Sequence, residues 1–477
     1  MTDPFDPIAL FRRSAENWPE REALSIASSP VSYAALDRWS DSIATALIDA
    51  GATSERISFV AHKQAGSYAA ILGILKAGCA YVPLHPDGPP ARWDRMITIC
   101  GARFHLGDTP ARTGLRHIAD PGPGVPGNST PVARMGDEAY VLFTSGSTGG
   151  PKGVSVSRAN VAAYLRHLLT AYDFTEQDRF TQFFALTFDL SVHDLFVCWG
   201  AGACLCVPPD ESALRTAAFV HNERITSWFS VPSLPALMDR MRGLKPGTFP
   251  TVTRAFFCGE GLPYDTVRGF ASAAPYTTMT NLYGPTEATI AITSHAIDRT
   301  SLDRHGLVPI GRPFPGHKII IDDEELCVSG PQISNGYLGL PEANAACFTD
   351  VTGSGERWYR TGDRARMDPD GTMHYLGRID HQIKVAGHRV EPGEVDALLT
   401  PLLSGGRAIT VPVHEAGAVR LVTFIDVPSD TTALLAHCRA HLPTYMVPER
   451  ILVHELLPLT THGKTDRQQL IAIAQHG

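Results

Sequence analysis

Residues 139–153 read Ala-Tyr-Val-Leu-Phe-Thr-Ser-Gly-Ser-Thr-Gly-Gly-Pro-Lys-Gly and place a glycine-rich loop directly after an apolar run. The run 139–143 predicts a buried strand. The glycines permit backbone conformations closed to other residues, and the hydroxyls and amides can surround phosphate oxygens beside the charge of Lys152. The Walker A pattern cannot be laid over the loop. A flexible surface loop is the alternative, and the buried strand before it argues for a phosphate-binding loop instead.

Upstream of this loop, predicted helices and strands alternate. Residues 32–48 carry apolar side chains at helical spacing, and a second helix is predicted at 67–77. Short apolar runs at 56–60 and 80–84 predict strands on either side of that second helix. Such alternation indicates parallel sheets covered by helices. The stretch 107–127 is rich in Gly, Pro and Asp and predicts a surface connection.

A domain break is predicted near Gly377-Arg378-Ile379-Asp380. A strand (382–385), a helix (394–403) and further alternation follow it, and about a hundred residues are enough for one small α/β domain. We therefore expect an N-terminal domain at 1–379, a C-terminal domain at 380–477 and a hinge at Asp380.

The composition excludes several classes of protein. The 477 residues carry 41 Lys+Arg against 49 Asp+Glu, a net charge of −8, which argues against a nucleic-acid-binding protein. No apolar window is long enough to span a bilayer, and the acidic start lacks the features of a signal peptide. The 9 cysteines are scattered and odd in number, as expected for reduced thiols in the cytoplasm. We expect a cytoplasmic protein without nucleic-acid or membrane partners.

Six further stretches resemble, in the same order, motifs of the adenylate-forming superfamily, which includes peptide-synthetase adenylation domains, acyl-CoA synthetases and luciferases. The resemblance spans nearly the whole chain. It implies an α/β fold: a large N-terminal domain of parallel sheets covered by helices, with a small β-barrel-like part, and a small mobile C-terminal α/β domain. The stretches are 76–84 (KAGCAYVPL), 188–194 (FDLSVHD), 281–287 (NLYGPTE), 359–363 (YRTGD), 377–380 (GRID) and 457–467 (LPLTTHGKTDR).

The resemblance implies two half-reactions. A carboxylate attacks the α-phosphate of ATP to give an acyl adenylate and pyrophosphate, and a thiol or amine then takes the acyl group. By resemblance, Lys464 bridges the carboxylate and the α-phosphate, Glu287 holds Mg2+, and Thr286 helps to bind phosphate. Tyr283 stacks on adenine, and Asp363 binds the ribose. The implied nucleotide-binding residues are Thr144, Ser145, Gly146, Ser147, Thr148, Gly149, Lys152, Gly259, Glu260, Asn281, Tyr283, Gly284, Asp363 and Arg378.

Asp189 decides between branches of this superfamily. A buried carboxylate needs a cationic partner, which the α-ammonium of an amino acid supplies and a fatty or aryl acid does not. The alternative is that Asp189 caps a helix beside Ser191. The family's substrate-pocket positions map onto Asp189, Leu190, His193, Phe229, Phe256, Cys258, Leu282, Ile290, Ala291 and Lys464.

This set of residues implies a small, uncharged substrate side chain, because its walls are large and apolar. His193 either accepts a hydroxyl or fills a wall. The stretches 188–196 and 256–260 resemble D-alanine–carrier-protein ligases and discrete alanine-activating enzymes of antibiotic pathways. Alanine is therefore the favoured substrate, with glycine, serine, a small β-amino acid and either hand left open.

The acceptor is expected to be a separate carrier protein with a phosphopantetheine arm, because the sequence reaches Gly477 soon after Lys464 without a carrier-type serine motif. Coenzyme A, or the amine of a carrier-bound amino acid, remains an alternative acceptor. Three alternative functions also stay open: a D-alanine–carrier-protein ligase of teichoic-acid modification, an acyl-CoA ligase for a small non-amino acid, and a non-catalytic regulator.

Overall fold

The structure is a computed structural model that describes residues 3–107, 114–125, 136–146, 150–209, 212–385, 388–415, 418–454, 456–458 and 465–476. The chain forms two compact units, each assembled from segments far apart in the sequence. Unit 1 comprises Met1–Pro86, Cys100–Leu142 and Val154–Gly377, and unit 2 comprises Asp87–Ile99, Phe143–Gly153 and Arg378–Gly477.

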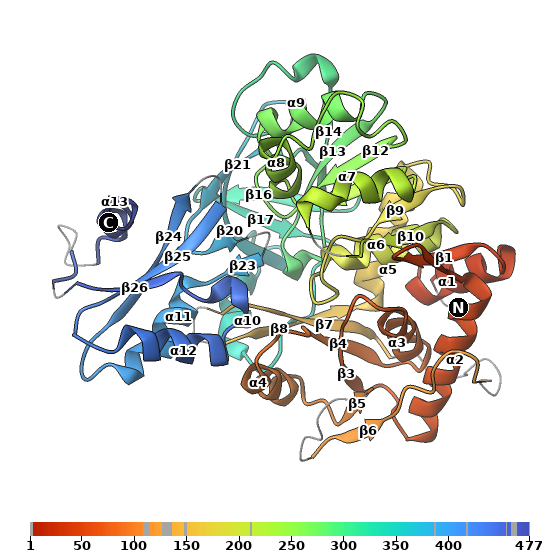
Figure 1. Ribbon diagram of the computed structural model, residues 1–477, viewed down its shortest axis with the longest axis horizontal. Helices are drawn as coiled ribbons and strands as arrows, with labels where there is room; N and C mark the ends of the chain where they lie inside the picture. The colour runs from red at the N-terminus through yellow and green to blue at the C-terminus, as the bar shows by residue number, and fades with distance from the viewer. Residues whose placement is uncertain are drawn as a thin grey trace. The chain divides into compact units, whose positions relative to one another are not determined.

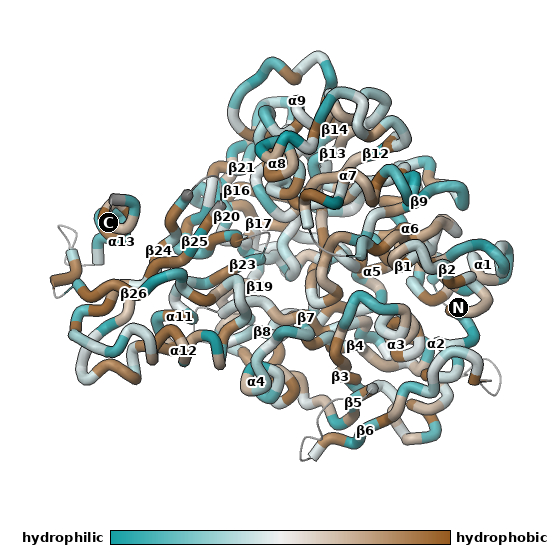
Figure 2. The backbone as a smooth tube through the Cα atoms, in the orientation of Figure 1, coloured by the Kyte–Doolittle hydropathy of each residue, from teal (hydrophilic) through white to brown (hydrophobic). Residues whose placement is uncertain are grey.

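The strand that leads into the glycine-rich loop lies in a mostly parallel sheet (Figure 1). Its residues 139–142 are buried, and Figure 2 draws β3, β4 and β7 largely in brown. A near-continuous apolar run is typical of a parallel strand that is covered on both faces. Within the described residues the order is β18 (Gly336–Tyr337), β8 (Lys152–Ser157), β7 (Glu138–Thr144), β4 (Ala80–Leu84), β3 (Arg56–Val60), β5 (Phe104–Leu106) and β6 (Arg116–Ile118).

A second sheet of unit 1 is parallel at its centre and antiparallel at both edges. Its central strands carry several of the predicted pocket residues at or near their carboxyl ends, the usual location of ligand sites in open α/β sheets. The described order is β15 (Arg312–Pro313), β14 (Thr293–Ile297), β13 (Thr278–Tyr283), β12 (Arg254–Phe257), β11 (Ser227–Ser230), β9 (Arg179–Thr181), β10 (Cys204–Val207), β1 (Glu22–Ile26) and β2 (Ser29–Ser32).

Helices cover both sheets and close two apolar cores. One core joins side chains of α1, α2, α3, α5 and α6 to strands of both sheets, and the other packs α7, α8 and α9 on β10 to β13. The helices are α1 (Pro7–Asn17), α2 (Tyr33–Asp49), α3 (Ala65–Lys76), α5 (Arg158–Ala171), α6 (Leu190–Gly200), α7 (Ala213–Asn222), α8 (Ser233–Arg240) and α9 (Tyr264–Ala273).

Helix α5 begins with a capping box. The Ser157 hydroxyl accepts a hydrogen bond from the backbone N–H of Asn160 (3.0 Å), and the Asn160 side chain accepts one from the Ser157 N–H (2.9 Å). The amide nitrogen of Asn160 also donates to the carbonyl of Pro331 (2.7 Å). The cap thus fixes both the start of the helix and its attachment to a distant loop.

We expect Ser157→Ala to lower the free energy of unfolding by about 1 kcal/mol, because one N–H of the first helical turn loses its partner. Urea denaturation followed by circular dichroism measures this change. Ser157→Asp, which keeps an acceptor, should retain most of the stability. Equal losses in both variants would contradict the capping role.

A smaller antiparallel sheet completes unit 1. It contains a hairpin in which Asp322 pairs with Glu325, so that Asp323 and Glu324 alone form the turn. Both turn residues have positive φ (49° and 65°), which suits the twist of a two-residue hairpin. The described strands of this sheet are β16 (Lys318–Asp322), β17 (Glu325–Ser329), β20 (Trp358–Met367), β19 (Phe348–Thr349) and β21 (Met373–Arg378). Unit 1 also contains the helix α10 (Pro341–Cys347) and two short helices, η1 (Thr286–Ala288) and η2 (Arg299–Ser301).

Unit 2 has its own apolar core, built around a sheet that α11 and α12 pack against. A buried ion pair joins Arg92 on its first segment to Glu394 on α11 (2.7 Å). Its elements are α4 (Pro90–Cys100), β22 (Ile383–Val385), β23 (His388–Val390), α11 (Pro392–Leu399), η3 (Thr400–Leu402), β24 (Ala408–Glu415), β25 (Ala418–Ile425), α12 (Thr431–His441), η4 (Thr444–Met446), β26 (Arg450–Val453) and α13 (Arg467–His476).

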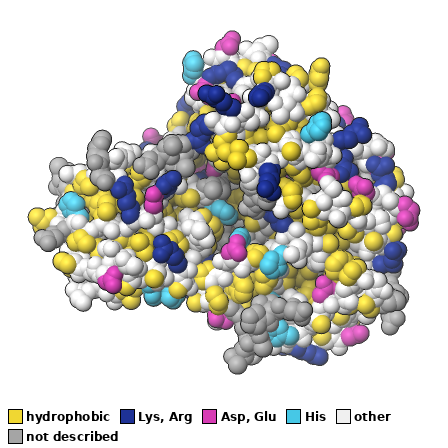
Figure 3. Space-filling model, in the orientation of Figure 1, with side chains coloured by type: hydrophobic (Ala, Val, Ile, Leu, Met, Phe, Trp, Pro, Cys, Tyr) yellow, Lys and Arg dark blue, Asp and Glu magenta, His cyan; other side chains and the backbone are white. Residues whose placement is uncertain are grey.

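The visible surface carries charges of both signs, and the cysteines lie mostly in the interior. Figure 3 shows acidic and basic side chains intermixed on the visible face. All cysteines are unbridged, and all are buried except Cys347, which is partly exposed. In the part of the chain that the structure describes, no helix combines the length and apolarity needed to cross a bilayer.

Candidate active site

Asp189 stands at the start of α6, where its side chain makes no capping hydrogen bond to the first helical turn, all of which is described. The Ser191 hydroxyl donates instead to the carbonyl of Phe188 (2.7 Å). Only 4% of Asp189 is exposed. The alternative role of this carboxylate as a helix cap is therefore contradicted, and its buried charge stands next to the amino end of α6, which favours a negative charge.

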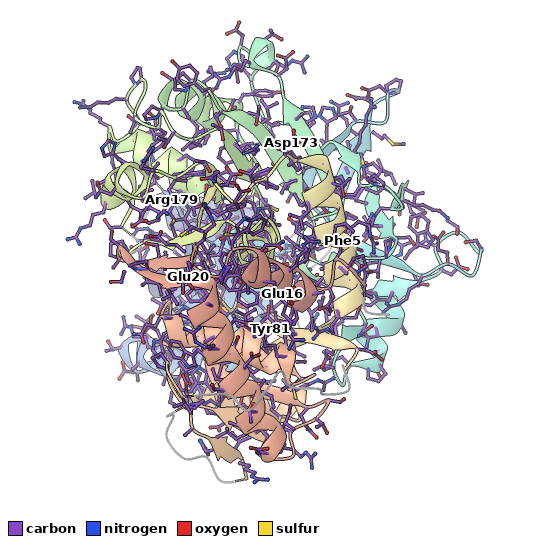
Figure 4. The ribbon with its side chains drawn as sticks, turned by 90° about the vertical axis from the view of Figure 1, so that its right-hand side faces the viewer. Phe5, Glu16, Glu20, Tyr81, Asp173 and Arg179 are labelled. Atoms are coloured by element: carbon purple, nitrogen blue, oxygen red, sulfur yellow. The ribbon has the colours of Figure 1, made fainter. Side chains whose placement is uncertain are left out.

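The Asp189 charge acts on three buried tyrosines. Burial raises the pKa of Tyr81, Tyr140 and Tyr164, and the nearby Asp189 charge adds to the rise at each. Tyr81 on β4 (labelled in Figure 4) and Tyr140 on β7 pack with ring centroids 5.4 Å apart. These phenols stay protonated at neutral pH, so none of them adds a second negative charge near Asp189.

His193, one turn into α6, is fully buried and uncharged. Burial lowers its pKa to about 3, and its Nδ1 lies 2.6 Å from the Tyr164 hydroxyl. Its ring lies 4.2 Å from that of Phe229 and 5.6 Å from that of Phe256. Its Nε2 has no hydrogen-bond partner among the described residues. The packing fits a wall position, and the neutral ring excludes a charge–charge role.

The apolar residues of the predicted pocket all belong to the larger apolar core of unit 1. They lie on α6, β11, β12, the residue after β12, β13 and the turn after β13, and each is at most 2% exposed. The sequence separates them by up to 101 positions, so only the fold could bring them together. The clustered residues are Leu190, Phe229, Phe256, Cys258, Leu282, Ile290 and Ala291.

The turn after β13 is tightly wound. A side-chain carbon on Gly284 would lie 2.5 Å from the Cα of Ala291, so only glycine fits there. Thr289 and Ile290 have positive φ (55° and 73°), an uncommon conformation for β-branched residues. Backbone strain of this kind is typical of functional sites whose surroundings enforce it.

Glu287 lies on this turn with 1% of its surface exposed. Its Oε1 accepts a hydrogen bond from the Tyr337 hydroxyl (2.6 Å). Its backbone carbonyl accepts one from the N–H of Ser334 (2.8 Å). The neighbouring Thr286 is partly exposed. The Glu287 carboxylate is therefore buried and held in one orientation, and the residue before it, Thr286, carries a hydroxyl.

Tyr283, Asp363 and Asn281 lie on neighbouring parts of unit 1. The Tyr283 hydroxyl donates to Asp363 (2.5 Å) although the two residues are 80 positions apart. Asn281 donates through its amide nitrogen to Pro309 (2.9 Å), while its Oδ1 has no hydrogen-bond partner among the described residues. A buried acceptor without a partner is rare and is often satisfied by a ligand.

The described part of the glycine-rich loop belongs to unit 2. The Ser145 hydroxyl donates to the carbonyl of Arg389 (2.7 Å) and accepts from the N–H of Glu391 (3.0 Å). A side-chain carbon on Gly146 would lie 2.2 Å from the carbonyl oxygen of Gly150, so the loop closes on itself. Thr144 ends β7 and Lys152 begins β8. The predicted residues Ser147, Thr148 and Gly149 lie outside the described residues.

The remaining predicted residues have other neighbours or are not described. The Glu260 carboxylate accepts hydrogen bonds from the N–H and hydroxyl of Ser233 (2.9 and 3.2 Å), at the start of α8, and Gly259 before it has φ 93°. Arg378 pairs with Asp380 in unit 2 (2.9 Å). Lys464 lies outside the described residues. The roles assigned to these residues, and the hinge at Asp380, stay predictions.

A family model described as AMP-binding enzyme matches residues 11–338. The chain belongs to the AMP-binding enzymes.

Individual relatives and a solved structure resemble this chain over nearly its whole length. A D-alanine–D-alanyl carrier protein ligase from Lacticaseibacillus rhamnosus is 31% identical over 98% of this chain and 99% of its own length. The AMB antimetabolite synthetase AmbB of Pseudomonas aeruginosa is 34% identical over 97% of this chain, which spans only 38% of that protein. The Vibrio cholerae adenylation domain AlmE, solved with glycyl-adenosine-5'-phosphate, superimposes with a TM-score of 0.87 at 26% identity and covers 100% of this chain and 98% of its own.

The residues of this AMP-binding enzyme fit a magnesium nucleotide. Mg2+ prefers oxygen ligands and is commonly held by one or two carboxylates together with substrate phosphates. Glu287 offers one buried carboxylate, and the described residues contain no cluster of three or more His, Cys, Asp or Glu that would form an all-protein metal site. The Oδ1 of Asn281 fits the exocyclic amine of adenine.

The sequence motifs did not indicate that residues 332–337 support the turn that carries Glu287. Gln332 donates to the carbonyls of Thr289 and Ala291 (2.9 and 2.7 Å), and Tyr337 reaches Glu287. Gly336 in this segment has φ 105°, a conformation that other residues rarely adopt. No sequence pattern indicated which site the segment would touch.

Proposed function

We propose that this protein is an amino-acid adenylating ligase. It joins the carboxylate of a small amino acid, with alanine favoured, to the α-phosphate of ATP and releases pyrophosphate. It then transfers the aminoacyl group from AMP to the phosphopantetheine thiol of a separate carrier protein.

The single observation that carries this proposal is the environment of Asp189. Only 4% of Asp189 is exposed, its side chain does not cap α6, and its charge adds to the effect of burial in raising the pKa of Tyr81, Tyr140 and Tyr164. A buried carboxylate in a substrate pocket favours a ligand that carries a positive charge and hydrogen-bond donors. The ammonium of an amino acid supplies both the charge and the donors, whereas a simple organic acid supplies neither.

The size of the substrate is inferred from the neighbouring core cluster. Phe229 and Phe256 stand against His193, and Leu282 and Ile290 are fully packed. Large aromatic and branched walls leave room for a small side chain. His193 is uncharged and the other clustered residues are apolar, so a charged substrate side chain would be buried without a partner.

The nucleotide is proposed to bind along the turn after β13. Asn281 and Tyr283 would hold adenine, and Asp363 would accept hydrogen bonds from the ribose. Glu287, with Thr286 beside it, would hold Mg2+, which supplies positive charge against the phosphates when bound. Lys464 would stabilise the charge that develops as the carboxylate meets the α-phosphate.

The proposed acceptor follows from relatives that match this chain over nearly their full length. Two D-alanine–D-alanyl carrier protein ligases are each covered over 99% of their length. A carrier protein delivers its thiol on a flexible phosphopantetheine arm, so the ligase must admit the arm after pyrophosphate leaves. Rotation about Asp380 is the proposed means of exchanging the groups around the adenylate.

A panel of amino acids in ATP–pyrophosphate exchange tests this function. We expect exchange with alanine, weaker exchange with glycine and serine, and none with lysine, glutamate or tryptophan. One extra or missing methylene in a filled pocket changes the ratio of kcat/KM values between two substrates by about 10- to 200-fold. Both enantiomers of alanine belong in the panel, because the D-alanine ligases match this chain from end to end.

The test also compares alanine with propionate as the acid, and a carrier protein with coenzyme A as the acceptor. Propionate, which is alanine without its ammonium, is expected to support no exchange. Transfer is followed with a phosphopantetheinylated carrier protein and, in parallel, with coenzyme A. Exchange with propionate but not with alanine would overturn the proposal in favour of an acyl-CoA ligase, and the absence of any exchange with every acid tested would favour a regulator.

A further inference from the structure

Tyr337 connects two parts of unit 1 that flank the proposed metal site. It lies on β18, whose residues pair with Val154 and Ser155 of β8. Its hydroxyl donates to Oε1 of Glu287 at 2.6 Å, and only 5% of Tyr337 and 1% of Glu287 is exposed. A hydrogen bond to a buried carboxylate is short and strong compared with one between neutral groups.

The backbone of Tyr337 is held from both sides by one amide side chain. Asn344 accepts a hydrogen bond from the Tyr337 N–H (2.7 Å) and donates one to the Tyr337 carbonyl (2.8 Å). The ring of Phe348 packs edge-on against the Tyr337 ring with centroids 5.6 Å apart. The surrounding scaffold therefore fixes the position of the hydroxyl.

The main chain around Glu287 is held by the same segment. Ser334 donates to the Glu287 carbonyl (2.8 Å), and Thr289 donates through its hydroxyl to the carbonyl of Gln332 (2.7 Å). With the backbone fixed, the remaining freedom of Glu287 lies in its side-chain torsions. The Tyr337 hydroxyl restricts those torsions by engaging Oε1.

We infer that Tyr337 is the positioning residue that orients the Glu287 carboxylate toward Mg2+ during adenylation. This inference rests on the proposed function, since Mg2+ at Glu287 is part of that proposal. A group that donates to a ligating carboxylate fixes its orientation, and loss of such a partner typically costs about 10- to 100-fold in metal affinity or activity. Tyr337 itself touches neither nucleotide nor amino acid in this scheme.

The test measures nucleotide binding as a function of free Mg2+. Tyr337→Phe and wild type are titrated calorimetrically with an ATP analogue whose α,β-bridge is a methylene, so that no adenylate can form. We expect Tyr337→Phe to need about 10-fold more free Mg2+ for half-maximal binding. At saturating Mg2+ the analogue should bind as in wild type, and kcat for pyrophosphate exchange should approach the wild-type value.

Tyr33→Phe is the matched control. Tyr33 is also fully buried, and its hydroxyl donates a hydrogen bond of similar length to the carbonyl of Ala203 (2.7 Å), far from Glu287 in the sequence and on other elements. We expect its Mg2+ dependence to equal that of wild type. An equal shift in both variants would overturn the inference, because it would reflect a general effect of losing a buried hydroxyl.

Glu287→Gln separates the inference from the proposed function. If Glu287→Gln leaves the Mg2+ dependence unchanged, the proposed metal site is wrong and the inference falls with it. If Glu287→Gln shifts it and Tyr337→Phe does not, only the inference is overturned. In the double variant Tyr337→Phe should add no further shift, because its effect passes through Glu287.

A melting curve of each variant accompanies the titrations. If Tyr337→Phe does not fold, Asn344→Ala takes its place, since it loosens the Tyr337 backbone but keeps the hydroxyl. We expect this variant to show the same Mg2+-dependent weakening. Wild-type Mg2+ dependence in a folded Asn344→Ala protein would then overturn the inference.

Discussion

Asp189→Ala is expected to raise the KM for the amino acid by at least about 100-fold while leaving the KM for ATP nearly unchanged. The variant would bury the substrate ammonium without its counter-charge, and breaking a buried ion pair costs about 3 to 5 kcal/mol. Pyrophosphate exchange at varied alanine and ATP measures the two constants separately. The KM for ATP should stay nearly unchanged, because the proposed nucleotide contacts in unit 1 lie on β13, η1 and β20 and not on α6.

Propionate serves as the control substrate for this variant. Wild type is expected to discriminate strongly for alanine over propionate, and Asp189→Ala should lose most of that discrimination, since the variant can no longer pair the ammonium. Asp189→Asn, which keeps the size of the side chain but removes its charge, should behave like the alanine variant. An unchanged amino-acid KM in both variants would refute the amino-acid branch of the proposed function.

Lys464→Ala is expected to slow formation of the aminoacyl adenylate by about 100- to 1,000-fold, the usual cost of removing one preorganised electrostatic contact. The lysine would act only as charge develops at the α-phosphate, so the loss should appear in kcat more than in the binding of either substrate. Single-turnover formation of the adenylate, followed by quench and chromatography, measures this step directly.

The second half-reaction provides the contrast for Lys464. When a chemically prepared aminoacyl adenylate is supplied, transfer to the carrier should proceed at a rate much closer to that of wild type. Lys384→Ala, a second lysine of unit 2 on β22, controls for the general loss of a positive charge. Equal losses in both half-reactions would contradict a role confined to adenylation.

Local sequence patterns predicted the regular elements well where burial imposed them. The runs at 56–60 and 80–84 are β3 and β4 with those same limits, because a strand covered on both faces is mostly apolar along its buried residues. The helix predicted at 32–48 is α2, and Ser32 is its cap. The connection predicted at 107–127 was wrong in part, since β6 pairs with β5 inside it. Three residues are too few to display a strand period.

The sequence predicted only those residues of the candidate site that lie inside a recognisable motif. Motif order indicated Asp189, Glu287 and Asp363, but it could not indicate that the Tyr283 hydroxyl donates to Asp363 or that Tyr337 donates to Glu287. Those bonds join residues 80 and 50 positions apart, and their partners are set by sheet topology. Glu260 illustrates the converse, because a carboxylate inside a matched stretch holds the start of α8.

The distribution of thiols has a practical consequence for following the two units in solution. Cys347 on α10 is the one cysteine with partial exposure, and the others are buried. A maleimide dye should therefore react first at that position. Replacing Cys347 alone would give a nearly silent background, into which one new surface cysteine in each unit could be placed for energy-transfer measurements. Such a pair of dyes would test the proposed rotation about Asp380 without rebuilding the apolar cores.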